Sequence, residues 1–324
     1  MIKSAVSVVS TVLNEEQDID RLVTSLMEQT LAPAEVIIVD GGSTDGTWER
    51  LLAAKAKYPN LIPIRDESCR LPMSQGPIAR GRNEAIRAAS SKVVACADAG
   101  CSYEPDWLER LTGSIRNGEA EYAVGGSCID LEHRTIWDIA SAPFFGIKLR
   151  ADAKTKSCTA RSMAFRKELW QRVGGFPEDI FFGEDAIFDL KARTLVTPAF
   201  ADRAKAFYRP LHTLRSAIRQ LASYSVSDGV SGARPARLIR NLERCVVELI
   251  AVVALIRTPI PLFCVLLLEI YFAFRLDMRS LRGASVTTLA ARLLFSLLVP
   301  WVVVWNQIRG SITKQNLVNR QNAA

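Results

Sequence analysis

The sequence predicts an α/β fold for roughly its first two-thirds, in which helices cover both faces of a mostly parallel sheet. One observation behind this prediction is that short β-branched runs alternate with segments whose apolar residues recur at helical spacing. Another is composition, because 49% hydrophobic residues among 324 allow a sizeable core and argue against disorder. A helical, basic and apolar segment is expected to follow this fold.

The expected elements follow one another in order along the chain. Residues 5–12 and 35–40 are β-branched runs, and between them Ile19, Leu22 and Leu26 recur at helical spacing, which predicts a βαβ unit. The same alternation then repeats. The full set comprises strands at 5–12, 35–40, 61–65, 92–97 and 122–129, helices at 18–28, 47–58, 81–90 and 106–117, and short elements at 161–175 and 183–193.

Two of these strands end in an acidic residue. Asp40 and Asp98 are each followed by glycines or small residues, which let a ligand approach the backbone. In open parallel sheets ligands bind outside the carboxyl ends of the strands. We therefore expect Asp40 and Asp98 to face one cleft.

The C-terminal third predicts a membrane-associated region. A helix is expected over 213–224, and the Gly-, Ser- and Pro-containing residues 229–235 predict a linker, which divides the chain into an α/β domain (1–228) and a second region (229–324). Residues 245–274 and 285–305 are largely apolar, but neither is a clean span of about 20 uninterrupted apolar residues. Burial inside a soluble domain remains the alternative, and the number of membrane crossings stays open.

Charge and cysteine usage narrow the location and the partners. The formal net charge is +7, and many of the Lys and Arg residues lie beside the apolar stretches, which favours anionic lipid as a partner. No zinc-finger spacing or basic-region heptad points to nucleic acid. Seven scattered cysteines without a CxxC pair favour a reduced compartment. We expect a protein at the cytoplasmic membrane, with its α/β domain on the cytosolic side.

Four separated motifs carry the candidate chemistry. A carboxylate at a strand end can accept hydrogen bonds from a base or a ribose, an Arg fork suits phosphate oxygens, and an acidic helix start suits a general base. The motifs are Leu13-Asn14-Glu15-Glu16 with Asp40-Gly41-Gly42-Ser43-Thr44-Asp45-Gly46-Thr47, then Ala79-Arg80-Gly81-Arg82-Asn83-Glu84-Ala85-Ile86, then Cys96-Ala97-Asp98-Ala99-Gly100-Cys101, and finally Gly174-Gly175-Phe176-Pro177-Glu178 with Gly183-Glu184-Asp185.

In this order the motifs resemble those of family-2 glycosyltransferases of the GT-A fold. The resemblance spans about residues 7–224 and implies an inverting enzyme that uses a nucleoside-diphosphate sugar. It implies that Asp185 is the general base and that Glu184 is its orienting partner. It also implies a nucleotide-sugar site formed by Leu13, Glu15, Asp40, Gly42, Arg82 and Asp98.

The same resemblance implies a divalent metal, Mg2+ or Mn2+, held by an Asp-x-Asp motif. Here Asp98 is present but Gly100 replaces the second acid, so the ligand set is incomplete. Water, the diphosphate or His212 would have to complete it, and a structural role is the stronger expectation for His212. The expected acceptor is a lipid-linked or saccharide hydroxyl in polysaccharide or glycolipid synthesis.

Two other functions remain open on the sequence. One is transfer to a polyprenyl phosphate, whose acceptor oxygen is already an anion and needs no general base. The other is an inactive, nucleotide-binding membrane regulator, which would explain the lost acid at Gly100 and the glycine at Gly41 where the family often has a second acid.

Overall fold

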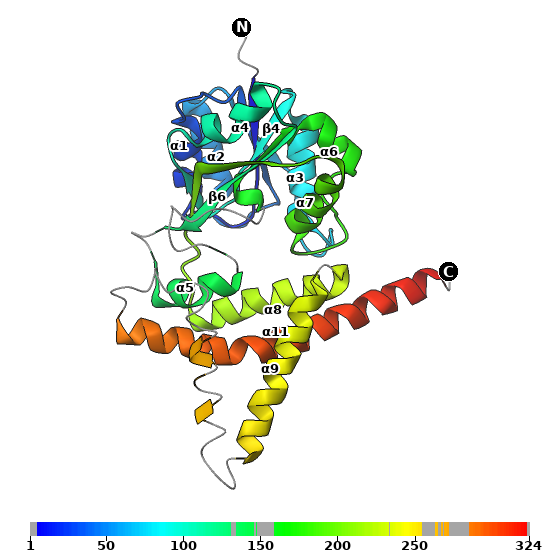
Figure 1. Ribbon diagram of the computed structural model, residues 1–324. Helices are drawn as coiled ribbons and strands as arrows, with labels where there is room; N and C mark the ends of the chain where they lie inside the picture. Colours follow the sequence, from blue (N-terminus) through cyan, green and yellow to red (C-terminus); the bar gives the residue numbers. More distant parts are fainter. Residues whose placement is uncertain are drawn as a thin grey trace. The chain divides into compact units, whose positions relative to one another are not determined.

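The structure of the chain is a computed structural model that describes residues 5–130, 134–145, 147, 159–232, 234–254, 263–264, 267, 269–271 and 285–322. The chain forms two compact units. The first comprises Met1–Asp130 and Arg150–Arg209, and the second comprises Leu131–Leu149 and Pro210–Ala324. Figure 1 shows the sheet of the first unit and the long helices of the second.

The first unit is built on one eight-stranded sheet with the order β3-β2-β1-β4-β7-β6-β8-β5. The first four strands in this order pair in parallel, as predicted, whereas β7 runs antiparallel to both of its neighbours. The strands are β1 (Val6–Val12), β2 (Glu35–Asp40), β3 (Leu61–Arg65), β4 (Val93–Cys96), β5 (Cys101–Tyr103), β6 (Tyr122–Ile129), β7 (Met163–Arg166) and β8 (Ala199–Tyr208).

Helices cover both faces of this sheet, which confirms the predicted α/β fold. Successive side chains of a strand point to opposite faces, so Val8 packs in one apolar cluster and Val9 in the other. Helices α1, α2 and α4 supply the first cluster, and α3, α6 and α7 supply the second. These helices are α1 (Ile19–Met27), α2 (Thr47–Lys57), α3 (Pro77–Ala88), α4 (Trp107–Arg116), α6 (Lys167–Val173) and α7 (Glu184–Leu195).

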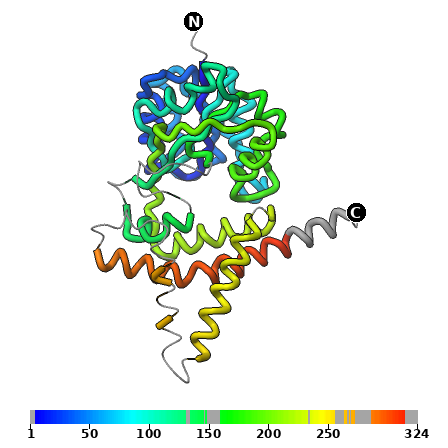
Figure 2. Tube along the Cα trace, in the orientation of Figure 1, coloured from blue at the N-terminus to red at the C-terminus, as the bar shows by residue number. Residues whose placement is uncertain are grey.

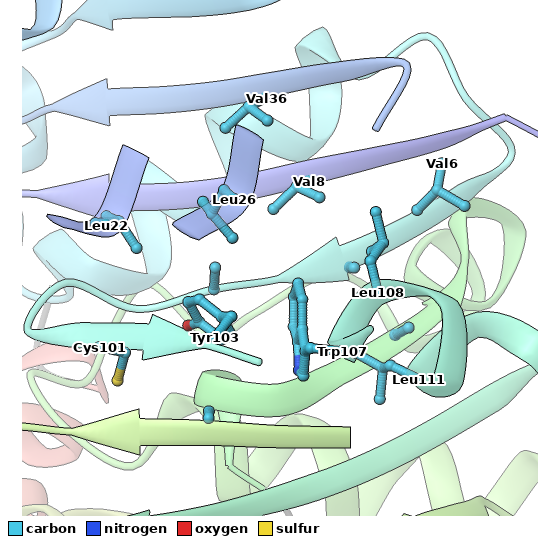
Figure 3. Close-up of a cluster of buried hydrophobic side chains, with 14 of the residues drawn as sticks. Val6, Val8, Leu22, Leu26, Val36, Cys101, Tyr103, Trp107, Leu108 and Leu111 are labelled. Carbon is cyan, nitrogen blue, oxygen red and sulfur yellow. The ribbon is translucent and has the colours of Figure 1, made fainter. Parts of the chain in front are cut away.

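Trp107 is the largest fully buried side chain of the first cluster. It packs with Leu108 and Leu111 of its own helix against Val8 of β1, and its ring lies 4.2 Å from that of Tyr103 (Figure 3). Its indole N–H donates to Ser162 Oγ at 2.8 Å, so no polar group is left unsatisfied by the burial.

Some elements differ from the sequence prediction. Helix α3 begins at Pro77, four residues before the predicted start, because Pro at the first helical position loses no hydrogen bond. The short β5 was not predicted, and neither was β8, whose charged residues 202, 203 and 205 break the apolar pattern of a strand. The sequence predicts no element between residues 130 and 160, and part of that segment lies outside the described residues.

The second unit is helical and comprises α5 (Ile136–Ser141), α8 (Leu214–Ser231), α9 (Pro235–Ala254) and α11 (Val286–Asn322). Thr213 and Ser216 form a capping box that starts α8, close to the predicted start. The helix continues to Ser231, so the predicted linker shortens to a turn at Gly232, where φ is +69°. Much of the predicted apolar stretch 245–274 lies outside the described residues.

Helices α8 and α11 pack with their backbones close together, as the tube in Figure 2 shows. A Cβ on Gly229 would lie 2.1 Å from the carbonyl oxygen of Gln307, and a Cβ on Gly310 would lie 2.1 Å from that of Val226. Both positions therefore require glycine.

The predicted domain boundary at residue 228 stays a prediction, because a compact unit is not by itself a functional domain.

Candidate active site

The turns that follow β1 and β2 are tied to each other by hydrogen bonds. The backbone N–H of Asn14 donates to Ser43 Oγ at 2.8 Å, and that of Thr44 donates to Asn14 Oδ1 at 2.9 Å. The N–H of Glu15 donates to Thr47 Oγ1 at 2.8 Å. These hydrogen bonds hold the two turns side by side. The turns carry Leu13, Glu15 and Gly42, which are predicted nucleoside-binding positions.

Asp40 is fully buried and shapes the second of these turns. Its Oδ1 accepts hydrogen bonds from the backbone N–H of Ser43 at 2.9 Å and from Ser43 Oγ at 2.6 Å. Gly41 serves the chain's own packing, because a Cβ there would lie 2.7 Å from the carbonyl oxygen of Cys69. Gly42 has a φ of +84°, which favours glycine. In this structure Asp40 positions the loop.

Arg82 links the end of β4 to the start of α7. This side chain of α3 is 1% exposed, and its guanidinium donates to Asp98 Oδ1 at 2.8 Å and to Glu184 Oε1 at 2.6 Å. Burial acts to lower the pKa of Arg82, but the Asp98 and Glu184 carboxylates outweigh it and raise that pKa above its ordinary value. Arg82 is therefore a fixed positive charge that joins two of the predicted motifs.

Asp185 follows Glu184 in the first turn of α7, after Gly183 in a left-handed conformation. Glu184 is enclosed at 5% exposure, whereas Asp185 is only half-buried. Asp185 Oδ2 accepts a hydrogen bond from the backbone N–H of Ala160 at 3.1 Å. Asp185 is therefore a partly exposed carboxylate held at the N-terminus of α7.

Glu15, in the turn after β1, is a carboxyl group of the site whose pKa is raised. Burial, followed by the nearby carboxylates of Asp18, Asp45 and Asp98, raises the pKa of Glu15 to about 7, and the charge of Arg21 acts in the opposite direction. Because β1 and β4 are parallel neighbours, the turns that follow them lie at the same edge of the sheet.

An arginine network at the turn after β4 was missed by the sequence analysis. Arg21 Nη2 donates to the carbonyl oxygen of Gly100 at 3.0 Å and to Asp18 Oδ1 at 3.2 Å. Arg209 donates to the same Asp18 oxygen at 2.5 Å, and its backbone N–H donates to Gly100 at 2.9 Å. No local sequence pattern connects Arg21, on α1, with Arg209, which follows β8.

The residues around Asp98 do not fit the two-acid metal site that the resemblance implies. Asp98 Oδ1 is bonded to Arg82, and Gly100 offers no side-chain oxygen. Among the described residues no group of three or more His, Cys, Asp or Glu side chains is arranged to hold a metal. His212 has a structural partner in the second unit, where its Nδ1 lies 3.1 Å from Asp138 Oδ1.

Comparison with known proteins places these motifs in a family. The sequence profile of Glycosyl transferase family 2 matches residues 7–174, just over half of the chain. Glycosyltransferase AglE of Haloferax volcanii is 30% identical over 193 residues, which are 58% of this chain and 60% of that protein. Dolichol-phosphate mannosyltransferase of Pyrococcus furiosus is 30% identical over 122 residues, 37% of this chain and 32% of that protein.

A solved structure shares the fold. The mannosyltransferase PcManGT from Pyrobaculum calidifontis, in complex with GDP-Man and Mn2+, superposes with a TM-score of 0.53 and 18% identity over 97% of this chain and 87% of that one. At this identity the likeness shows the fold alone, and that fold is the expected GT-A fold. The chain spans 60% or less of the length of the two curated relatives it matches here. By the profile match, the chain belongs to glycosyl transferase family 2.

Proposed function

We propose that this chain is an inverting glycosyltransferase that moves a sugar from a nucleoside-diphosphate sugar to a hydroxyl of a lipid-linked or saccharide acceptor. The observation that carries the proposal is the bridge from Asp98 through Arg82 to Glu184. It joins a strand end, where a donor would bind, to the helix start that bears Asp185. The GDP-Man complex of PcManGT supports a nucleotide-sugar donor.

The proposed reaction is a single displacement. Asp185 accepts the proton of the acceptor hydroxyl while the hydroxyl oxygen attacks the anomeric carbon. The bond from that carbon to the diphosphate breaks on the opposite face, and its electron pair leaves with the nucleoside diphosphate. General-base catalysis of this kind contributes roughly 10²–10⁴-fold. Glu184, enclosed and bonded to Arg82, holds the start of α7 in place.

The donor is identified first. A thermal-shift panel of UDP, GDP and dTDP sugars is measured with the full chain, because a ligand that binds only the folded state raises its melting temperature. Acceptors are then screened with the donor that stabilises most. Binding of a donor without turnover on any acceptor would favour the inactive nucleotide-binding regulator instead.

The base is tested with Asp185→Asn. We expect kcat to fall by about 10²–10⁴-fold while donor affinity changes little, because the amide cannot take the proton. Asp179→Asn is the matched control, since Asp179 is an exposed acid on the loop that precedes α7. Both variants should keep the melting temperature of the parent chain.

Transfer to a polyprenyl phosphate is the second candidate, favoured by the partial match to a dolichol-phosphate mannosyltransferase. Its acceptor oxygen is already ionised. Asp185→Asn would then keep most of its activity on a polyprenyl phosphate, and this result would replace the hydroxyl acceptor with the anionic one.

We further propose that the second unit associates with a membrane. Helix α9 buries polar Asn241 and Glu248 but exposes apolar Ile250 and Val253, the reverse of a helix on a water-soluble protein. Glu248 Oε2 accepts a hydrogen bond from the Trp301 indole at 2.6 Å. Polar groups that face protein while apolar groups face outward suit a lipid environment.

Helix α11 adds to this support. Its Val286–Thr313 portion is long and apolar enough to cross a membrane, although 44% of its most apolar window is buried, as in a core helix of a soluble protein. Trp301 and Trp305 are largely exposed on it, and indole rings favour the membrane interface. Exposed Arg234 and Arg240 near the start of α9 would meet anionic headgroups. The cytosolic placement of the first unit remains part of this proposal.

The membrane proposal is tested by sedimenting the full chain with anionic or neutral phospholipid vesicles. We expect binding to anionic vesicles, and we expect Ile250→Asp to weaken it by at least about fivefold, because a carboxylate is costly in hydrocarbon. Leu52→Asp, an exposed leucine of α2 in the first unit, is the control and should bind like the parent. A parent chain that stays in the supernatant with both vesicles would indicate a soluble helical unit.

A further inference from the structure

The turn between β4 and β5 carries a feature that the family resemblance does not explain, namely the backbone of Gly100. Gly100 has a φ of +68°, a left-handed conformation that side-chain-bearing residues rarely adopt. Its carbonyl oxygen accepts hydrogen bonds from Arg21 Nη2 at 3.0 Å and from the backbone N–H of Arg209 at 2.9 Å. Where the family places a metal-binding carboxylate, this chain therefore places a backbone carbonyl that is bonded to an arginine side chain.

The remaining acid of the motif is also engaged by a cation. Asp98 Oδ1 lies 2.8 Å from Arg82 Nη2, and Arg82 is fully enclosed, so the pair is held in place. A divalent cation requires several oxygen ligands in open positions. Asp98 is a single carboxylate that already neutralises an arginine, so it is a weak starting point for a divalent-cation site.

A further arginine lies beside the same turn. The guanidinium of half-buried Arg161 lies 4.2 Å from the centroid of the Tyr208 ring. Tyr208 pairs with Cys101 across β5 and β8, and a Cβ on Gly100 would lie 3.5 Å from Tyr208 Cε2. Tyr208 thus connects Arg161 with Gly100. Stacking fixes the plane of a guanidinium, and a planar guanidinium suits bidentate hydrogen bonding to phosphate oxygens.

The pKa of the Cys101 thiol agrees with the position of Arg161 and Arg21 near the turn between β4 and β5. Burial raises the pKa of the Cys101 thiol to about 12; Arg161 and Arg21 act to lower it, and Asp98 acts to raise it. The thiol of Cys101 is therefore within the fields of both arginines and of Asp98. The positive charge at this turn comes from Arg21 on α1, from Arg161 in the 3-10 turn before β7 and from Arg209 just after β8, and Arg82 adds charge from α3.

We propose that arginine side chains at the turn between β4 and β5, with Arg161 as the residue that contacts the phosphates, neutralise the diphosphate of the donor in place of a divalent metal. The inference rests on the proposed function, because it assumes a nucleoside-diphosphate sugar as the donor. It assigns to Arg161 the binding of the diphosphate in the bound donor and the stabilisation of the diphosphate that departs.

The test is isothermal titration of the chelator-treated full chain with UDP and GDP, in EDTA and in Mn2+. For the nucleotide that binds, we expect the two dissociation constants to agree within about threefold. Arg161→Gln should weaken binding by about tenfold or more, the loss expected for a charge-assisted phosphate contact, and Arg161→Lys should weaken it less. Arg172→Gln, which removes a surface arginine paired with Glu121, is the matched control and should bind like the parent.

The possible outcomes separate the inference from the proposed function. Binding that is at least tenfold tighter in Mn2+ than in EDTA would overturn the inference while supporting the proposed function. Parent-like affinity in Arg161→Gln, or in Arg161→Lys if the Gln variant does not fold, would overturn the role of Arg161. Failure of both nucleotides and of their sugars to bind in either buffer would overturn the proposed function itself.

Discussion

At the scale of single residues, the site contains a buried positive charge that is matched by two carboxylates. Arg82 is enclosed between Asp98 and Glu184, so its removal would leave two carboxylates without their cation in a poorly solvated place. Sequence reasoning singled out all three residues as site candidates, because each lies in a recognisable motif. It could not predict that Arg82 pairs with both acids, because that contact depends on how α3 and α7 pack.

Arg82→Met is expected to destabilise the fold by about 3–5 kcal/mol, the range for breaking a buried ion pair on one side. Urea unfolding of the full chain measures it. Arg172→Met, at an exposed ion pair with Glu121, should change the free energy of unfolding by less than about 1 kcal/mol. Equal effects of the two substitutions would show that Arg82 is not the buried link described here.

Glu15 predicts a pH dependence of stability. Its pKa is raised from 4.5 to about 7 in the folded chain, so between these pH values the folded state holds a proton that the unfolded state has lost. Folding stability therefore falls as the pH rises through this window. The Glu15→Gln variant has no carboxyl group to titrate at this position. Its free energy of unfolding, minus that of the parent, should therefore rise by about 1–3 kcal/mol from pH 4.5 to pH 8.

Urea unfolding of parent and Glu15→Gln chains at several pH values checks this expectation. Glu49→Gln, at an exposed position in the first turn of α2, is the control and should show no such trend. A constant difference between Glu15→Gln and the parent across the window would contradict the raised pKa.

At the scale of elements, the spacing of apolar residues predicted the strands and helices in which this spacing is regular. The strands at 61–65 and 122–129 have the predicted bounds. Pattern reasoning failed where tertiary pairing decides the structure, as in the three-residue β5, which exists through its antiparallel pairing with β8. It also missed the start of α3, where Pro77 marks the beginning of the helix and not a break.

Helix α3 packs on β1 at a distance that only glycine permits. A Cβ on Gly81 would lie 2.2 Å from Thr11 Oγ1, so Gly81→Ala should destabilise the fold by about 1–3 kcal/mol despite the better helix propensity of Ala. Gly113→Ala in α4 is the matched control, because nothing lies within 4 Å of its Cβ position. It should stabilise the chain by about 0.5–1 kcal/mol. Thermal unfolding that ranks the two variants the other way would contradict the packing of α3 on β1.

At the scale of the whole molecule, the chain combines a sheet-based unit that carries every predicted site residue with a helical unit in which α9 exposes apolar side chains. The motif order along the sequence predicted the first unit and its family. The contacts within the second unit, such as Arg244 with Glu269 and Trp301 with Glu248, could not be predicted, because they join segments that are distant in sequence and lack a motif.

The central claim is that the turns after β1, β2 and β4, together with the starts of α3 and α7, form one nucleotide-sugar site. Hydrogen exchange of the full chain, with and without the donor that stabilises it most, tests this claim directly. The account predicts joint protection of peptides that cover residues 13–16, 41–47, 80–84, 97–103 and 183–186, with no ligand-dependent change in α9. Protection confined to a single one of these segments, or found only in α8, α9 and α11, would contradict it.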